Sequence, residues 1–244
     1  MRGSQSSVVE LRQYTLHPGR RDVLIDLFDR EFVETQEAAG MAVLGQFRDL
    51  DDPNRFVWLR GFDGMPRRAP ALGRFYGGPV WKAHRDQANA TMIDSDDVLL
   101  LRPVAAGSGF PAPATPRPLA GRTAAPPSLV LATLYYRDRP FDEAFVDFFD
   151  RRVRPVLAET GAAPLACLQT EHADNDFPAL PVRTGENAFV WFARFGGPAD
   201  LDDHQRRLRS SARWQEQVWP ALSAMLSGAP QQLRLAPTAR SLLR

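Results

Sequence analysis

The residues most able to do chemistry in this sequence lie near its start, at alternating positions. Glu10, Arg12 and Tyr14 are each two residues apart, and alternate residues of a strand share one face. An arginine can stabilise a carboxylate or an enolate, and a tyrosine hydroxyl can donate a hydrogen bond to a ligand carbonyl. The alternative is structural: Glu10 and Arg12 pair with each other, and Tyr14 is a buried aromatic with a satisfied hydroxyl.

The segment FVWLRGF places one more charged residue among aromatic ones. In an extended chain Phe56, Trp58 and Arg60 share one face, and Val57 and Leu59 share the other. An arginine in a dry pocket is suited to stabilising a developing negative charge. Two groups of candidates follow: Arg12, Tyr14 and Arg60 for catalysis, and Glu10, Phe56 and Trp58 for substrate binding.

Histidine is the natural general base near neutral pH. His84 follows Trp81 by three residues, at the edge of the apolar stripe of a predicted helix, so it is a candidate catalytic base or haem ligand. His204, which opens another predicted helix, is the second candidate axial ligand. The alternative for His84 is a partly exposed histidine without a role. The histidines show no HxH or ExxH spacing, so no metal is expected.

The segment FVWLRGF recurs as FVWFARF at residues 189–195, 133 positions later. At the same separation Trp81 corresponds to Trp214, and at a separation of 121 Tyr14 corresponds to Tyr135. The difference fits an insertion within residues 172–186. Matches at constant separation over several segments indicate an internal duplication.

Both copies show the same order of predicted elements. The alternating, β-branched segment 8–16 is typical of a strand, and apolar residues three and four positions apart then predict a helix. Gly40 and Gly161 stand where a helix often ends on glycine. A hairpin, a second helix at about 79–92 in the first copy and a short strand follow. The order βαββαβ, written twice, is the ferredoxin-like motif of an α+β fold.

The duplication predicts three parts of the chain. Residues 8–104 and 129–238 are the two repeats. Residues 105–128 contain six prolines and no apolar periodicity, which favours an extended, semi-rigid linker. Because two helices cover only one face of a four-stranded sheet, the other face must be buried. The second repeat supplies a matching sheet, so we expect one closed barrel that is a pseudo-dimer within one chain.

Strand alternation suggests where a ligand would bind. We expect the aliphatic Val57 and Leu59 to face the helices, and the aromatic and charged residues to line a cavity between the two sheets. Tyr135 and Trp191 retain the aromatic positions and are predicted to bind substrate. The charged positions are replaced in the second repeat by Leu131, Thr133 and Ala193. This asymmetry suits one small, mostly apolar ligand with a polar or anionic end.

Composition excludes several classes of protein. The net charge of +1 predicts neither nucleic-acid nor membrane binding, and no apolar run reaches the roughly 18 residues of a membrane helix. Cys167, as a single cysteine, favours a reducing compartment, and we expect a cytoplasmic protein. The polar N-terminal segment MRGSQSS lacks the apolar core of a secretory signal, and we leave it out of the fold prediction. A homodimer of the chain remains an open alternative.

The first repeat resembles the NIPSNAP family within the dimeric α/β-barrel superfamily. The resemblance rests on VELRQYTLHPGRRDVLIDLF, on Gly40, on FVWLRGF and on the arginine-containing segment that leads to Pro79 and Trp81. The second repeat shows it in diluted form, because it lacks the Glu-Leu-Arg and Pro-Gly elements. The resemblance implies a fold whose members include cofactor-free monooxygenases, isomerases and cyclases, and also haem-binding enzymes.

Three function classes follow from the sequence. The first is an enzyme without a prosthetic group, in which Arg12, Tyr14, Arg60 and His84 act on an apolar, aromatic or polyketide-like substrate. The second is a non-catalytic protein that binds a ligand in the same cavity. The third is a haem protein with His84 or His204 as axial ligand.

Overall fold

The computed structural model describes residues 6–244, so residues 1–5 of the N-terminal segment lie outside the described part. The first half of the chain contains four strands and, between them, helices that include one π-helical turn. In chain order these are β1 (Val8–Leu16), α1 (Arg21–Leu27), η1 (Phe28–Phe32), α2 (Val33–Ala38), β2 (Ala42–Asp49), β3 (Arg55–Phe62), α3 (Met65–Tyr76), α4 (Pro79–Asn89) and β4 (Met92–Pro103).

The second half repeats this order. Its elements are β5 (Leu129–Tyr136), α5 (Glu143–Phe148), η2 (Phe149–Val153), α6 (Arg154–Glu159), β6 (Ala166–Thr170), β7 (Ala188–Phe195), α7 (Pro198–Ser210), η3 (Trp214–Val218), α8 (Trp219–Ser223) and β8 (Gln231–Pro237). Gly40 and Gly161 follow the first helix of each half with φ of 96° and 102°, a conformation that favours glycine. Both were predicted as helix-terminating glycines, and this is confirmed.

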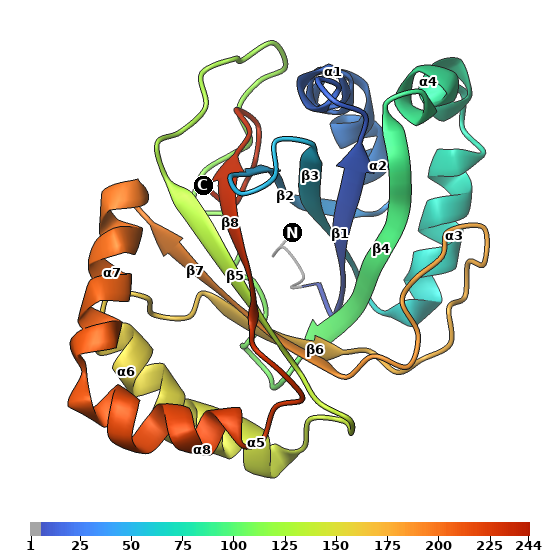
Figure 1. Ribbon diagram of the computed structural model, residues 1–244. Coiled ribbons are helices and arrows are strands. Elements are labelled where there is room, and N and C mark those ends of the chain that lie inside the picture. The colour runs from blue at the N-terminus through green and yellow to red at the C-terminus, as the bar shows by residue number, and fades with distance from the viewer. Residues whose placement is uncertain (1–5) are drawn as a thin grey trace.

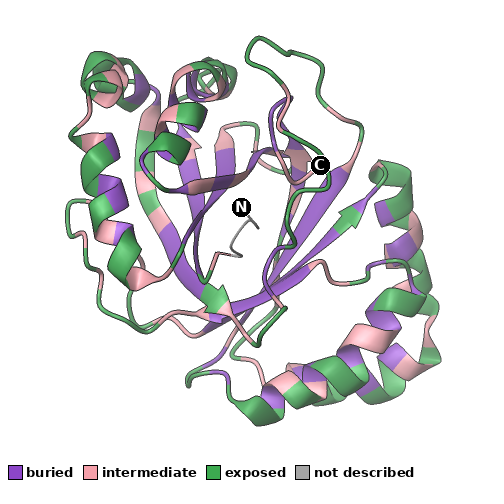
Figure 2. Cartoon of the chain, turned by 180° about the vertical axis from the view of Figure 1, so that it is seen from behind, coloured by how far each residue is buried: buried purple, intermediate pink, exposed green. Residues whose placement is uncertain are grey.

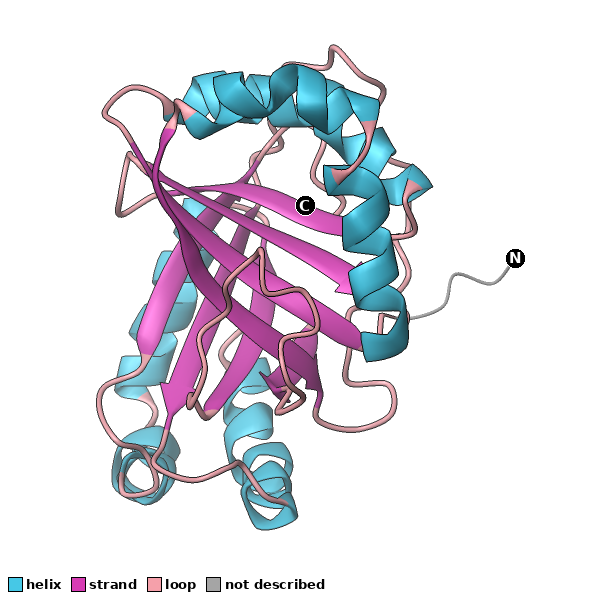
Figure 3. Ribbon diagram, turned by 90° about the vertical axis from the view of Figure 1, so that its right-hand side faces the viewer, coloured by secondary structure: helices cyan, strands magenta, loops and turns pink. Residues whose placement is uncertain are grey.

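The eight strands form one closed antiparallel barrel in the order β1-β3-β2-β8-β5-β7-β6-β4 (Figure 1). Strand β2 pairs with β8, and β4 pairs with β6, so each half closes the open edges of the other. The helices lie outside the barrel against both sheets (Figure 3). The predicted fold of two ferredoxin-like repeats in one intrachain barrel is confirmed.

The barrel interior is packed with aliphatic side chains from both halves. Buried residues of the strands contact one another across it, and Figure 2 shows the strands as the most buried part of the chain. Among them are Val9, Leu11, Val57, Leu59, Val130, Ala132, Leu134 and Val190. An eight-stranded barrel is just wide enough for such side chains to fill. The prediction of a ligand cavity between the two sheets is therefore wrong.

The predicted assignment of strand faces is also wrong. Val57 and Leu59 face the barrel interior, whereas Phe56 and Trp58 pack against the helices. The ring centroids of Trp58 and the helical Phe28 are 4.8 Å apart. The interior holds mostly aliphatic side chains, together with Phe47, Phe110 and Phe192, and the layer under the helices holds Phe56 and Trp58. Every predicted site residue on these strands therefore lies beneath a helix.

The sequence predicted one helix between the third and fourth strands of each repeat, but the structure has two consecutive helical segments there. Helix α4 corresponds to the predicted one, and α3 precedes it. Prolines at positions 66 and 70 of α3 obscured its pattern, because proline disfavours helix interiors. This extra helix carries Arg68, which is essential to the site described below.

Two long segments without helix or strand connect distant parts of the chain. Residues 104–128 join β4 to β5, and Arg117 in this segment donates hydrogen bonds to the carbonyl oxygens of Arg240, at 2.7 Å, and of Val43. Residues 171–187, between β6 and β7, contain the predicted insertion and lie against the first half. Across residues 6–244, no helix has the length and apolarity needed to span a membrane.

We predict that Leu59→Ala, inside the barrel, lowers the free energy of unfolding by about 2–5 kcal/mol, because it leaves a cavity among packed aliphatic side chains. Leu59 is fully buried, whereas Leu119 in the linker is 85% exposed. Chemical denaturation of Leu59→Ala, with Leu119→Ala as the control, measures the difference. Equal stabilities of the two variants would contradict a filled barrel interior.

Candidate functional site

A buried carboxylate joined to three arginines lies between the first sheet and its helices. Glu10 on β1 accepts hydrogen bonds of 2.7 Å from Arg12 Nη1, from Arg60 Nε on β3 and from Arg68 Nε on α3. All four side chains are at most 1% exposed. The predicted alternative, in which Glu10 pairs with Arg12, is therefore found within a larger network that we call the Glu10 cluster: Glu10, Arg12, Arg60 and Arg68.

The Glu10 cluster carries more positive than negative charge. Three guanidinium groups face one buried carboxylate, and the half-buried Asp176, which forms an ion pair with Arg68, supplies the second. In these ion pairs of residues 6–244, three arginines thus share two carboxylates, which leaves an excess of one positive charge. A buried charge without a counter-ion is unfavourable, so the cluster favours the arrival of an anion.

The ionisation states follow from burial and neighbouring charge. Burial alone raises the pKa of Glu10, but the attraction of Arg60, Arg12 and Arg68 outweighs it and holds this pKa well below its ordinary value. Burial raises the pKa of Tyr14, despite the opposing charge of Arg12. Glu10 is therefore ionised and Tyr14 is a neutral phenol at physiological pH.

Several donors of this region are buried without a partner. Within residues 6–244, Trp58 Nε1, Arg60 Nη2 and Arg68 Nη2 have no hydrogen-bond acceptor. The other Arg60 terminal nitrogen donates weakly to Gln36 and Tyr76, at 3.3 and 3.4 Å. A buried donor without a partner costs about 1–3 kcal/mol. These donors are therefore ready to bind acceptor oxygens of a ligand.

Trp58 lines an aromatic cavity of about 30 Å³, and Arg60 bonds to Gln36 and Tyr76, which also line it. Its lining residues come from β1, β3 and the helices of the first half: Tyr14, Leu24, Phe28, Phe32, Gln36, Trp58, Phe75, Tyr76, Trp81 and Met92. The volume suffices for a water molecule and is too small for an aromatic ring. A larger ligand therefore requires the residues that cover the cavity to move.

The loop of residues 171–187 from the second half covers the first half at this point. Arg68 Nη1 donates a hydrogen bond of 2.9 Å to Asn175 Oδ1 and also binds Asp176. Phe177 stacks on Tyr76, with ring centroids 6.2 Å apart. We call residues 171–187 the covering loop. It joins the charged network to the aromatic wall of the cavity.

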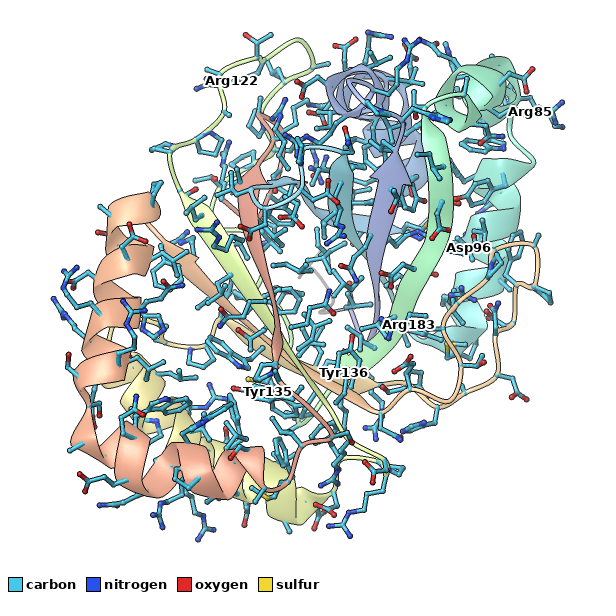
Figure 4. The ribbon with its side chains drawn as sticks, in the orientation of Figure 1. Arg85, Asp96, Arg122, Tyr135, Tyr136 and Arg183 are labelled. Carbon is cyan, nitrogen blue, oxygen red and sulfur yellow. The ribbon has the colours of Figure 1, made fainter. Side chains whose placement is uncertain are left out.

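The covering loop is fixed to the barrel at its far end. The backbone N–H of Arg183 donates to the carbonyl of Val98 on β4 at 2.9 Å, and the guanidinium binds Glu186 at 2.7 Å and Tyr136 at 3.2 Å. Arg183 and Tyr136 lie together beside β4 and β5 (Figure 4). The covering loop is therefore held in two places, at residues 175–177 by the first half and at Arg183 by β4 and Tyr136.

A second cavity, of about 330 Å³, occupies the equivalent place in the second half. Its residues match those of the first cavity at the separations of 121 and 133. Tyr135, Leu157, Trp191, Leu208 and Trp214 stand where the first half has Tyr14, Gln36, Trp58, Phe75 and Trp81. The single shared cavity predicted from the sequence is thus two separate cavities, one in each half.

The predicted site residues divide between these places. Arg12, Tyr14, Arg60, Glu10, Trp58 and Phe56 lie together in the first half, and Tyr135 and Trp191 line the second cavity. His84 lies apart on α4, with Nε2 3.7 Å from Glu31 Oε2 and a side chain 31% exposed. The structure does not bring it to the Glu10 cluster.

Sequence reasoning missed Arg68, Gln36, Tyr76 and the covering loop's Asn175 and Asp176. Arg68 belongs to the arginine-containing segment noted for the NIPSNAP resemblance, and this was the one available signal. The amide of Asn175 and the carboxylate of Asp176 come from the other repeat. They lie 107 and 108 residues from Arg68 in the sequence. No local pattern relates residues at that distance.

Comparison with solved structures defines the class of fold. A proposed monooxygenase of Fusobacterium nucleatum subsp. nucleatum matches with a TM-score of 0.55 at 8% identity, over 96% of this chain and 93% of that chain. A second proposed monooxygenase, from Lactobacillus acidophilus, matches with a TM-score of 0.52 at 11% identity, over 96% of this chain and 94% of that chain. An anthrone oxidase-like protein matches with a TM-score of 0.53 at 10% identity, over 97% of this chain and 92% of that chain. The chain therefore shares the fold of tandem dimeric α/β-barrel structures.

Within that class the first repeat can be assigned more closely. Residues 9–107 match the model of the NIPSNAP family and form a NIPSNAP domain. The resemblance predicted from the sequence is confirmed for this part of the chain. No curated protein gives a significant match.

We predict that Glu10→Gln lowers the free energy of unfolding by about 3–5 kcal/mol at pH 7, because three guanidinium groups lose their shared counter-ion in a buried site. Thermal and urea denaturation measure the loss. Asp22→Asn is the control, because it removes only the surface ion pair with Arg48, which is worth at most about 1 kcal/mol. Equal effects would contradict the role given to Glu10.

The sign of the pH dependence follows from the lowered pKa of Glu10. Its stabilising contribution is present above its ordinary pKa of 4.5 and is lost as the pH falls below that value through the lower folded-state pKa. The difference between wild type and Glu10→Gln should therefore be constant above about pH 5 and shrink progressively as the pH falls below 4.5. A difference that vanished already between pH 7 and 5 would show that Glu10 is not held ionised.

Proposed function

We propose that the protein is a small-molecule enzyme that works without a prosthetic group, and that its substrate binds as an anion in the first cavity. The observation that carries this proposal is the Glu10 cluster: a buried excess of positive charge with unpaired donors, next to an aromatic cavity. Charge of one sign in a dry pocket selects a ligand of the opposite sign. The aromatic walls select a mostly apolar one.

The cluster is suited to holding an enolate, a phenolate or a carboxylate. Arg60 Nη2 and Trp58 Nε1 are donors without acceptors among the described residues, and the neutral Tyr14 can also donate its proton. Glu10 accepts bonds from all three arginines, so it is not free to act as a base. The substrate should therefore carry an acidic proton that it gives up to solvent water, so that it binds as an anion.

A bound anion of this kind supports three reaction types. Isomerisation and cyclisation proceed from an enolate by return of a proton or by carbon–carbon bond formation. Monooxygenation also consumes dioxygen: a CH₂ group becomes C=O, and the second oxygen atom leaves as water. Proposed monooxygenases and an anthrone oxidase-like protein share this fold, which agrees with the third type.

The alternatives are a binding protein and a haem protein. A non-catalytic protein would use the same contacts, so only turnover separates it from an enzyme. Haem fits less well, because an axial histidine must face open space. His84 contacts Glu31 and Phe32 and lines neither of the two cavities. His204 lines the second cavity, but its Nδ1 is 3.3 Å from the carbonyl of Thr160.

We predict that benzoate binds the first cavity at least about tenfold more tightly than benzamide, which has nearly the same shape but no charge. The reason is that a hydrogen bond to a charged group contributes about 1.5–3 kcal/mol. Arg60→Gln should abolish this preference. Isothermal titration calorimetry with both probes measures it, and thermal denaturation checks that the variant is folded.

Arg60→Gln lowers the positive charge of the Glu10 cluster, and Asp176→Asn should raise it. The second variant removes one of the two carboxylates that oppose the arginines, so benzoate should bind about threefold to tenfold more tightly, the effect of roughly 1 kcal/mol for a partly exposed charge. If Arg60→Gln and Asp176→Asn left the ratio of benzoate to benzamide affinity unchanged, the Glu10 cluster would not be the anion site. A candidate substrate that bound without any turnover would favour the non-catalytic alternative.

A further inference from the structure

We propose that the second half holds a separate binding site with the opposite preference: it takes a neutral, planar aromatic molecule that carries a hydroxyl or carbonyl group. The site is the cavity of about 330 Å³ between the second sheet and helices α6, α7 and α8. It is independent of the Glu10 cluster and of the reaction proposed for the first half.

The size of this cavity has a cause in the sequence. Thr133 stands where the first half has Arg12, and Leu208 stands where it has Phe75. Both exchanges replace a long or bulky side chain by a shorter one. Thr133 and Leu208 line the second cavity, and Phe75 lines the first. The aromatic framework is kept, so the volume opens from about 30 to about 330 Å³, which lies within the range of small-molecule sites.

The polar groups of the cavity are buried and incompletely used. Thr133 is 2% exposed, and its hydroxyl has no hydrogen-bond partner among residues 6–244. A threonine hydroxyl both donates and accepts. The Tyr135 hydroxyl accepts a bond of 3.0 Å from Trp191 Nε1, and its own proton has no acceptor in the described part of the chain. Both groups suit a ligand oxygen.

The lining is electrically neutral. Among the described residues around this cavity there is no Asp, Glu, Lys or Arg. Burial raises the pKa of Tyr135, and burial lowers the pKa of His204 despite its hydrogen bond to Thr160. A charged ligand would therefore lose its hydration without gaining a counter-charge, which is strongly unfavourable.

Aromatic rings set the shape of the ligand. The rings of Trp214 and Trp219 are stacked, with centroids 5.9 Å apart and an angle of 27°, and Trp191 forms another wall. The exposed Gln215 and Gln232 stand at the solvent side. Tyr135 lies on β5 (Figure 4), with its ring in the core that this strand shares with the second-half helices. A flat ring can enter from the glutamine side with its oxygen toward Thr133.

Calorimetric titration of the full-length protein with 2-naphthol and with 2-naphthoate tests the proposal. We expect 2-naphthol to bind and Thr133→Val to weaken it about threefold to tenfold, the value of one net hydrogen bond. Leu208→Phe, which restores the residue of the first half, should weaken it further by filling the cavity. Thr238→Val is the matched control, because Thr238 is buried outside the cavity.

The two sites are distinguished by their probes and variants. Arg60→Gln should weaken benzoate and leave 2-naphthol binding unchanged, and saturation with benzoate should leave the 2-naphthol site available. The proposal is overturned if 2-naphthol does not bind, if 2-naphthoate competes at this site with equal affinity, or if Thr133→Val and Leu208→Phe bind 2-naphthol as wild type does. Loss of benzoate binding alone would instead count against the proposed function.

Discussion

The width of an eight-stranded barrel is the constraint on which the rest of this structure depends. Its interior accepts aliphatic side chains packed from all sides and leaves no room for a ligand. Trp58, Trp191 and the buried arginines that β1 and β3 supply to the Glu10 cluster lie instead on the outer face of the strands, beneath the helices. The two cavities described above then lie beneath different sheets, one for each half of the chain, and the two halves can differ in chemistry while they share one barrel.

The two halves differ in how they use the layer beneath the helices. The first half fills it with the Glu10 cluster, whose unpaired donors and excess positive charge favour an anion. The second half replaces Arg12 by Thr133 and keeps open space lined by neutral groups. The covering loop connects them, because Asp176 of the second half pairs with Arg68 and Phe177 stacks on Tyr76, which lines the first cavity. Duplication thus supplied a scaffold, and later substitutions produced two unlike cavities.

The sequence predicted the fold because duplication and alternation are local or periodic signals. It grouped Glu10, Arg12, Tyr14, Trp58 and Arg60 correctly, since alternate positions of a strand share a face whichever way that face points. It assigned the wrong face because polarity alone does not say whether a sheet buries its aromatic side in a barrel or under helices. It missed Arg68 in a proline-containing helix and Asp176 in a distant loop, because tertiary contacts alone bring them to Glu10.

The central claim is that an anion binds beneath the helices of the first half, against the Glu10 cluster. The most direct measurement is a crystal structure with 4-bromobenzoate, in which anomalous scattering locates the bromine and the density locates the carboxylate. The account predicts a carboxylate within hydrogen-bond distance of Arg60 Nη2 and Trp58 Nε1, with the ring among Phe28, Phe75 and Tyr76. A carboxylate bound inside the barrel, or in the second cavity with the first left empty, would contradict it.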